Sequence, residues 1–435
     1  MRRSSSHHRA LTIAAIWAMS TGAGGLAADA APAGRAIRVE SELGDGNRPV
    51  VVTVRDAVDR ALACDKDIAS ARDALVDADW QEIRARQLRD PELRLSHSGE
   101  SNQASARLYV PNPWVRSHRV GAAAAAGNAV SAELERAVWL LETRVRRAFA
   151  ELDFLDHDLA AVEELVDLRR RALELARQRL RGGQGTTPDL IPVSGRYLTA
   201  LSERDQAERK RGTARRQLAA LVMLPAHRLT LAVDDRRRLP TDLAGLSLLE
   251  LEQRAIRNRG DLLASSWRAR AASAACEESR SERIPWFRHV QASRTEDTGG
   301  GDEWSVEVAI SLPVFSWSSR KTGVEVTRYH RLQTAAGQAS RRVGQEVRSA
   351  WHAVEEAFEA RRLYEERTNP LVSELNTVHE ELRKEDGAFQ AQIIDIRIQF
   401  LAVERTRLRL KRAVTQALIQ LEEAVGTRLN RAGAQ

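Results

Sequence analysis

Histidine, cysteine and acidic side chains are the residues of this 435-residue chain that are best suited to catalysis or metal binding. Beyond the N-terminal His7 and His8, none of the histidines has the spacing of a metal-ligand motif. They are His97, His118, His157, His227, His289, His330, His352 and His379. The chain also lacks a Gly-x-x-x-x-Gly-Lys loop, a His-Glu-x-x-His motif and paired cysteines. We therefore expect no enzymatic activity, no cofactor and no bound metal.

The chain has two cysteines, Cys64 and Cys276. They lie at non-equivalent positions of the internal repeat described below. Two cysteines do not make a disulfide scaffold, although export from the cytoplasm permits one bridge. We expect two buried thiols, with a single disulfide as the alternative.

The N-terminus has the pattern of a secretory signal over residues 1–30. Three arginines, Arg2, Arg3 and Arg9, precede a short apolar stretch that ends near Met19. Either Ala28-Asp29-Ala30 or Gly25-Leu26-Ala27 offers a cleavage site. An uncleaved anchor is the alternative, but the apolar stretch is too short to span a bilayer. No cysteine follows it, so we expect no lipid anchor. Export makes nucleic acid an improbable partner despite the net charge of +7.

An internal repeat of about 200 residues sets the organisation of the chain. Thr53–Ala61 aligns with Ser247–Ala255. Both segments begin with a Ser or Thr that can cap a helix, and an acidic residue follows three positions later. Further matches follow in the same order: Asp67 with Asp261, Pro113 with Pro313, Gly121 with Gly323 and Gly183 with Gly387. Together, the signal pattern and the repeat divide the chain into six segments. They are a signal peptide over 1–30, an N-terminal extension over 31–50, a first repeat over 51–224, a linker over 225–246, a second repeat over 247–428 and a tail over 429–435.

Each repeat contains two long helices, which we predict at 121–181 and 188–224 and again at 320–385 and 391–425. Apolar residues recur in alternating steps of three and four, as in a coiled coil, from Val138 to Val166 and again from Leu410 to Ala424. Such seams usually mean helix–helix packing. Their length is unusual, because ordinary globular helices run over about 8–20 residues. The fold class is therefore mostly α with a small β part.

Two glycine-bearing turns reverse the long helices. In the first, Gly182 and Gly183 end a helix, Thr187 can cap the next, and Pro188 suits its first position. In the second turn, Gly387 is the expected residue after the helix end.

Each repeat also contains a predicted β-hairpin, over about 92–111 and about 286–312. In the second hairpin every other residue is apolar, and these positions are Trp304, Val306, Val308, Ile310 and Leu312. Strands of this length can cross a bilayer, although a soluble two-stranded ribbon is the alternative. Four strands are too few to close a barrel, so a spanning barrel needs several chains. Arg94 and Arg107 interrupt the pattern of the first hairpin.

Over about residues 50–428 the chain resembles the TolC-like outer membrane efflux protein family. The resemblance rests on the duplicated order of elements, on Ile310–Phe315, on the Gly-x-x-Thr-x-x-Asp turn from Gly183 to Asp189, and on Leu421–Gly426. It implies a homotrimer in which twelve strands, four from each chain, close one transmembrane β-barrel in outer-membrane lipid. The long helices then form a trimeric α-helical barrel through the periplasm.

The same resemblance implies roles for the two turns. The tip residues Gly182, Gly183, Thr187, Pro188, Gly387 and Gln390 would dock a periplasmic adaptor. Carboxylates would ring the periplasmic entrance, and the candidates are Asp189, Asp386 and Asp395. Such rings favour cations. For Asp189 the alternative is a first-turn carboxylate that the helix dipole stabilises.

The function that the resemblance implies is that of the exit duct of a tripartite efflux system. It would pass substrates from an inner-membrane pump or ABC transporter and a periplasmic adaptor, and the short hairpin loops favour heavy-metal cations or small molecules. One alternative is the outer-membrane channel of a type I protein secretion system. Another, of a different class, is a soluble periplasmic coiled-coil adaptor or scaffold.

Overall fold

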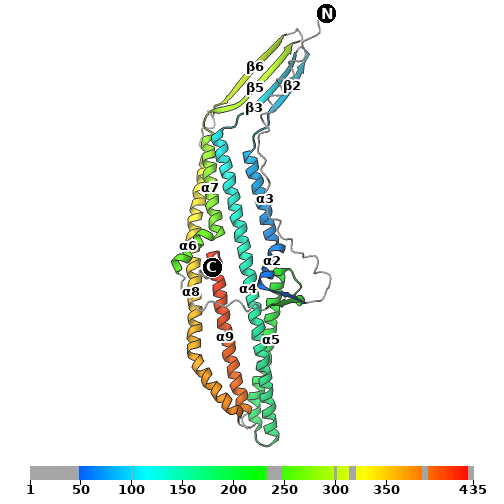
Figure 1. The fold of residues 1–435 in the computed structure, drawn as a ribbon, viewed down its shortest axis with the longest axis vertical. Coiled ribbons are helices and arrows are strands. Elements are labelled where there is room, and N and C mark those ends of the chain that lie inside the picture. The colour runs from blue at the N-terminus through cyan, green and yellow to red at the C-terminus, as the bar shows by residue number, and fades with distance from the viewer. Residues whose placement is uncertain are drawn as a thin grey trace. The chain divides into compact units, whose positions relative to one another are not determined.

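A computed structural model describes residues 49–99, 101–232, 247–297, 301–312, 320–384 and 390–429. The proposed signal peptide, residues 233–246 of the linker, and Asp386 and Gly387 lie outside the described residues. Among the described residues, helices predominate and a small sheet lies beyond one end of the long helices (Figure 1). The predicted class, mostly α with a small β part, is confirmed.

The two repeats contain the same order of helices and strands. In the first they are α2 (Val54–Cys64), α3 (Lys66–Arg86), β2 (Glu92–Ser98), β3 (Ser101–Tyr109), α4 (Pro113–Arg181) and α5 (Thr187–Val222). In the second they are α6 (Leu248–Asn258), α7 (Gly260–Ser281), β5 (Trp286–Asp297), β6 (Asp302–Ser311), α8 (Arg320–Lys384) and α9 (Gln390–Val425). Two short strands, β1 (Val50–Val52) and β4 (Leu229–Leu231), pair in parallel, and a single 3-10 turn, η2 (Ala226–Arg228), precedes β4.

Helix α4 begins earlier than predicted. We expected a start near residue 121, but the helix begins at Pro113 and runs for 69 residues. The side chain of Asn112 accepts hydrogen bonds from the backbone N–H groups of Trp114 (3.0 Å) and Val115 (3.4 Å). Pro113 in the first turn lacks the N–H that would otherwise need a partner. At 1.5 Å per residue, α4 is about 100 Å long.

The repeats build two equivalent hydrophobic cores. In the first, Leu141, Val145, Phe149 and Leu152 of α4 pack with helices α2 and α5. In the second, Val343, Val347, Trp351 and Val354 of α8 occupy the corresponding positions against α6 and α9. Leu218 of α5 and Leu421 of α9, also equivalent, are both fully buried. The duplication in the sequence is therefore a duplication of the packing.

The contacts between the repeats are not symmetric. Helix α4 packs against α7 and α9 of the second repeat (Figure 1). By the repeat, α8 should contact α3 and α5 in the same way, but among the described residues it makes no comparable contact with either helix. One side of the second repeat is therefore left without the helical neighbours that its counterpart has.

Helices α4 and α7 approach closely because Gly260 has no side chain. A Cβ atom at this position would clash with the backbone carbonyl oxygen of Ala132 and would lie 2.9 Å from Cβ of Arg136. The equivalent residue of the first repeat is Lys66, so the close approach belongs to the second repeat alone.

Gly260→Ala is expected to lower the free energy of unfolding by about 1–3 kcal/mol, because the helices must move apart to admit the methyl group. Denaturant unfolding of the full chain measures the change. Gly127→Ala in α4 is the matched control, since nothing lies within 4 Å of its added Cβ. Alanine should be neutral or stabilising there. Equal destabilisation by both changes would contradict the packing argument.

Candidate functional site

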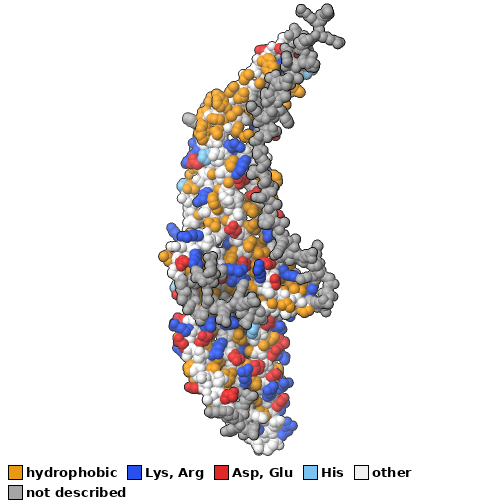
Figure 2. All heavy atoms as spheres, viewed as in Figure 1, with side chains coloured by type: hydrophobic (Ala, Val, Ile, Leu, Met, Phe, Trp, Pro, Cys, Tyr) orange, Lys and Arg blue, Asp and Glu red, His pale blue; other side chains and the backbone are white. Residues whose placement is uncertain are grey.

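The four strands β2-β3-β5-β6 form one antiparallel sheet whose exposed face is apolar. Val306 pairs with Ala292, Val308 with Val290 and Ile310 with Phe287. Residues directly opposite on neighbouring strands share a face, so these side chains form a continuous surface. Its members are highly exposed, with Val306 at 72% and Leu95 of β2 at 83%. Trp304 shares this face, and Leu312, which follows the end of β6, is exposed beside it. We call this surface the apolar band (Figure 2).

The opposite face of the sheet is polar, and it holds the two arginines that interrupt the first hairpin. Arg94 lies opposite Ser105, whereas Arg107 lies between Glu92 and Gln291. The Arg107 guanidinium donates a hydrogen bond of 2.8 Å to the side-chain oxygen of Gln291. Both arginines alternate with apolar residues of the other face, so they do not interrupt the apolar band. The sheet is therefore two-faced along all four strands.

Aromatic side chains gather at the helix-side end of the sheet. The rings of Trp114 and Trp286 meet edge to face at 5.3 Å between centroids, and Phe287 lies 5.7 Å from Trp286. A register shift between Phe287 and His289 leaves Arg288 without an opposite residue on β6. This is a β-bulge, which bends the strand where the sheet meets the helices.

The turn between α4 and α5 lies at the far end of these helices from the sheet (Figure 1). Gly182 is the C-cap of α4, and Gly183 takes a left-handed conformation with φ of 71°, which favours glycine. The capping residue of α5 is Thr186, so the expectation of a Thr187 cap was wrong by one position. Thr187 and Pro188 are the first two residues of the helix, and both are exposed.

Asp189 is an exposed carboxylate in the first turn of α5. It accepts hydrogen bonds from the hydroxyl (2.6 Å) and the backbone N–H (2.9 Å) of Thr186. These two bonds stabilise the charged form and lower the pKa of Asp189 below its ordinary value of 3.8. The carboxylate therefore holds the helix start and stays ionised well into acid.

In the second turn, Gln390 begins α9 and is exposed. Asp395 lies one turn further on, also exposed, and its charge acts on Arg169 of α4. The pKa of Arg169 is lowered, first by burial and then by the neighbouring Arg196 of α5, while Asp395 opposes the shift. Residues of α4, α5 and α9 thus meet near the turns, and Asp189 and Asp395 start the two returning helices.

Ion pairs connect α9 to the first repeat along its length. Arg405 pairs with Asp158 of α4 at 3.1 Å and with Glu203 of α5 at 3.0 Å. Arg397 pairs with Glu164 of α4 at 2.8 Å. Burial acts against the charge of Arg405, but its two carboxylate partners outweigh it and raise its pKa. The two helical pairs are therefore held together by polar contacts as well as by apolar packing.

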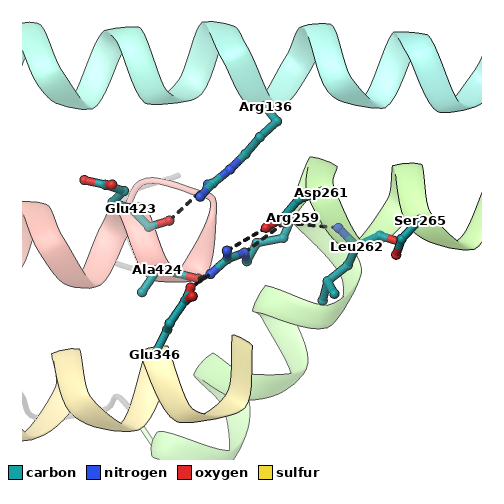
Figure 3. Close-up of polar contacts among 8 residues, drawn as sticks. All are labelled: Arg136, Arg259, Asp261, Leu262, Ser265, Glu346, Glu423 and Ala424. Atoms are coloured by element: carbon teal, nitrogen blue, oxygen red, sulfur yellow. Dashed lines mark hydrogen bonds and ion pairs between the residues drawn. The ribbon is translucent and has the colours of Figure 1, made fainter. Parts of the chain in front are cut away.

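Arg259, between α6 and α7, is a buried arginine that the sequence pattern did not reveal; its residue is only 3% exposed (Figure 3). Its guanidinium donates two bonds to Asp261 (3.0 and 2.7 Å), one to Glu346 of α8 (2.5 Å) and one to the carbonyl oxygen of Ala424 in α9 (3.2 Å). Arg136 of α4 donates to the neighbouring Glu423 carbonyl at 3.3 Å. One side chain thus joins three helices.

The repeat held a signal for this joint. The position equivalent to Arg259 in the first repeat is Asp65, whose carboxylate caps α3 by accepting from Asp67 and Ile68 N–H groups. In the second repeat the cap is replaced by a residue of opposite charge. A charge reversal at a capping position indicates that the residue has another partner.

The remaining reactive residues do not converge. Both thiols are free, so the alternative of a disulfide was wrong. The expectation of buried thiols is confirmed for Cys276, whereas Cys64 is half-buried. Within the described ranges, no group of three or more histidine, cysteine or acidic residues is arranged to hold a metal ion. In the same ranges, no helix carries an apolar stretch that could span a bilayer.

Comparison with solved structures identifies the architecture. No protein-family model and no curated protein sequence matches the chain. A membrane protein from Pseudomonas aeruginosa matches with a TM-score of 0.67 at 19% identity, over 86% of this chain and 93% of that one. CusC, whose structures concern folding and transmembrane channel formation, matches with a TM-score of 0.66 at 17% identity, over 88% of this chain and 94% of that one.

The outer membrane protein VceC of Vibrio cholerae also matches, with a TM-score of 0.64 at 17% identity, over 87% of this chain and 97% of that one. At such identities the likeness concerns the fold, and it extends over nearly the whole of each matched protein. The two-faced sheet, the duplicated cores and the long helices are thus arranged as in these proteins. The chain therefore has the TolC-like fold of bacterial outer-membrane channel proteins that its sequence resembles.

Proposed function

We propose that the protein is the outer-membrane exit channel of a tripartite efflux system. It acts as a homotrimer with a periplasmic adaptor and an inner-membrane pump or ABC transporter. The observation that carries the proposal is the two-faced sheet, whose apolar band is a continuous exposed surface across neighbouring strands. An exposed apolar surface of this extent needs a nonpolar environment. Outer-membrane lipid supplies one.

The strand edges support a shared barrel. Strands β2 and β6 are the two edges of the sheet, and each has one side without a strand partner among the described residues. Unpaired backbone groups cannot be placed in lipid, where no water satisfies them. Pairing β6 of one chain with β2 of the next removes every edge. Three chains then give twelve strands around a polar lumen lined by the face that holds Arg94 and Arg107.

The helices support the same stoichiometry. Among the described residues, helix α8 lacks the cross-repeat neighbours that α4 has in α7 and α9. The exposed apolar residues Val76, Trp80 and Ile83 lie at helical spacing on α3, where the repeat predicts the missing contact. Placing α3 and α5 of one chain against α8 of the next gives each helix equivalent surroundings. Such head-to-tail contacts close into a ring.

The turns are the proposed adaptor site and entrance. Gly182, Gly183, Thr187, Pro188, Gly387 and Gln390 form the docking tips in this proposal, with Asp189 and Asp395 at the entrance. The exposure of Thr187, Pro188 and Gln390 supports this assignment. We propose heavy-metal cations or small molecules as the cargo.

Reconstitution and fractionation test the function directly. The full chain should fractionate with the outer membrane and form ion-conducting pores in planar bilayers. Recovery as a soluble periplasmic protein would contradict the proposal and favour the adaptor alternative. Deletion should reduce tolerance of metals or drugs; unchanged tolerance, together with loss of a secreted protein, would favour type I secretion.

Asp189→Asn is expected to lower the cation preference of the pore by roughly threefold, because three ring charges are lost together. The reversal potential across a salt gradient measures the change. Since the pKa of Asp189 lies below 3.8, the wild-type preference should be the same at pH 7 and pH 5 and should fall only in stronger acid. Any stability that the carboxylate adds is likewise lost only as pH falls through this lowered pKa.

Thr186→Ala is the matched control for Asp189, because it removes the hydroxyl donor of the carboxylate and keeps both the backbone N–H donor and the charge. It should leave the selectivity at pH 7 unchanged. An unchanged reversal potential in Asp189→Asn would assign the carboxylate to helix capping alone. The same shift in both variants would show that turn conformation, rather than charge, controls the current.

A further inference from the structure

The two ends of the apolar band carry opposite charge. At the hairpin end, the acidic residues Glu296, Asp297, Asp302 and Glu303 surround one base, Arg294, which pairs with Asp302 at 2.6 Å. At the helix end, basic residues are in excess. Figure 2 shows Lys and Arg side chains directly below the hydrophobic surface over the strands. The sheet therefore carries excess negative charge at its hairpin end and excess positive charge at its helix end, along the direction in which it would cross a bilayer.

Arg116, Arg283 and Arg288 lie at the helix end, and none of them has a carboxylate partner among the described residues. Arg116 of α4 donates to the backbone oxygen of Arg86 at 2.8 Å, and Arg283 donates to the Thr322 hydroxyl at 2.6 Å. Arg288 occupies the β-bulge, where it is exposed. We call these three residues the basic collar. Each retains guanidinium donors that its protein contacts do not use.

Neighbouring bases at the same level differ, because they are already neutralised. Arg119 pairs with Glu278 at 2.9 Å, and Lys321 pairs with Glu282 at 2.6 Å. The excess positive charge of this rim therefore lies on arginines without a carboxylate partner. They include the basic collar and Arg89, whose guanidinium lies 5.1 Å from the centre of the Tyr109 ring.

Aromatic side chains accompany the collar. Trp114 and Phe287 are both partly exposed, and Trp114 meets Trp286 edge to face. Phe287 shares the apolar face with Ile310, and Arg288 follows it in the chain. An apolar surface that ends in aromatic rings and then in unpaired arginines follows the order of a lipid from its chains to its headgroup.

We propose that the basic collar of Arg116, Arg283 and Arg288 binds the phosphate groups of anionic phospholipids in the leaflet next to the helices. The inference rests on the proposed function, since it needs the apolar band to lie in a membrane. Guanidinium groups match phosphate oxygens in geometry and charge. Continuity with the apolar band favours a lipid over an acidic peptide, because one ligand then satisfies both surfaces.

Lipid binding to the purified full chain tests the proposal. The probes are short-chain fluorescent phosphatidylglycerol and the matching phosphatidylcholine, titrated in detergent at low salt. The wild type should bind phosphatidylglycerol more tightly, and added salt should weaken this binding. The triple variant R116Q/R283Q/R288Q should raise the Kd for phosphatidylglycerol at least roughly tenfold and leave that for phosphatidylcholine unchanged, since each arginine near an anionic lipid contributes about fivefold.

Matched charge loss elsewhere is the control. R144Q/R177Q/R257Q removes three exposed arginines that likewise have no carboxylate partner in the described part of the chain. It should leave both Kd values unchanged, and an equal loss in both triples would overturn the site assignment. Arg288→Gln alone should raise the Kd for phosphatidylglycerol about fivefold. Because Arg288 lies in an exposed bulge, this single change tests the site even if the triple variant fails to fold. Displacement of the lipid by inorganic phosphate at equal concentration would overturn the lipid assignment.

Insertion into vesicles separates this inference from the proposed function. Failure to insert into vesicles of phosphatidylethanolamine with or without phosphatidylglycerol contradicts the membrane role itself. Normal insertion and conductance, with no preference between the two fluorescent lipids, overturns the basic collar and leaves the channel intact. Insertion with the preference supports both.

Discussion

Val306→Arg is expected to prevent stable assembly of the protein in the outer membrane. Val306 lies within the apolar band, 72% exposed, with Ala292 opposite on β5. An arginine on the lipid face of a membrane strand costs about 2–4 kcal/mol near the bilayer midplane. In a trimer the cost applies three times. In the proposed assembly three chains would close one barrel, so the penalty would fall on a single assembly step and should remove most of the assembled form.

The measurement is the fraction of heat-resistant trimer in the outer-membrane pellet. Ser305→Arg, one residue earlier, is the control, because Ser305 lies opposite Ser293 on the polar face. An arginine there faces the proposed lumen, where Arg94 and Arg107 already lie, so the trimer should form. Equal loss in both variants would indicate a general defect of β6. Normal assembly of Val306→Arg would contradict a lipid-facing band.

Arg259→Met is expected to lower the free energy of unfolding by about 2–4 kcal/mol. Removing one partner of a buried ion pair costs about 3–5 kcal/mol when the other is left buried. The cost is smaller here because the side chains of Asp261 and Glu346 are 41% and 44% exposed, so water can reach both carboxylates after the change. The unpaired carbonyl of Ala424 adds to the loss. Thermal or denaturant unfolding measures it.

The acid limb of the stability curve gives a second readout for Arg259. Burial raises the pKa of Asp261, but the hydrogen bonds and charge of Arg259 outweigh it and hold the pKa below 3.8. A lowered pKa stabilises the fold above the ordinary pKa, and this stability is lost as pH falls through the folded value. Arg259→Met should therefore flatten the loss of stability below about pH 4. Arg257→Met, an exposed neighbour, should change stability by less than about 0.5 kcal/mol.

Periodic features of the sequence were sufficient to predict the elements. The seam from Val138 to Val166 follows one face of α4, and the alternation from Trp304 to Ile310 follows one face of β6. Both arise from local geometry, which sets a period of 3.6 in helices and 2 in strands. The same alternation places Arg94 and Arg107 on the face opposite the apolar residues. The contact of Arg107 with Gln291 could not be derived in this way, because β5 lies far away in sequence.

Polar contacts between helices that are distant in the chain could not be predicted from the sequence. The loss of the cap at Arg259 can be read from the repeat, but its partners can be identified only when α7, α8 and α9 are known to meet. The cap of α5 shows the opposite limit: Thr186 and Thr187 are adjacent and chemically equal, and only the backbone decides which accepts the first bond. Helix starts are the least certain part of any pattern. The predicted docking and entrance residues stay predictions.

Gly260 allows a close helix contact, whereas the equivalent residue of the first repeat, Lys66, does not, and this difference has a mechanical consequence. In a ring of three chains, six longitudinal seams would alternate between two kinds. The seam inside each chain is clamped by the close approach at Gly260 and the buried Arg259, whereas the seam between chains places Lys66 and Asp65 at the same level. Compliance would then concentrate in the three intersubunit seams. Such a tube would dilate by separation of three chains, each moving as one rigid unit, rather than by separation of six repeats.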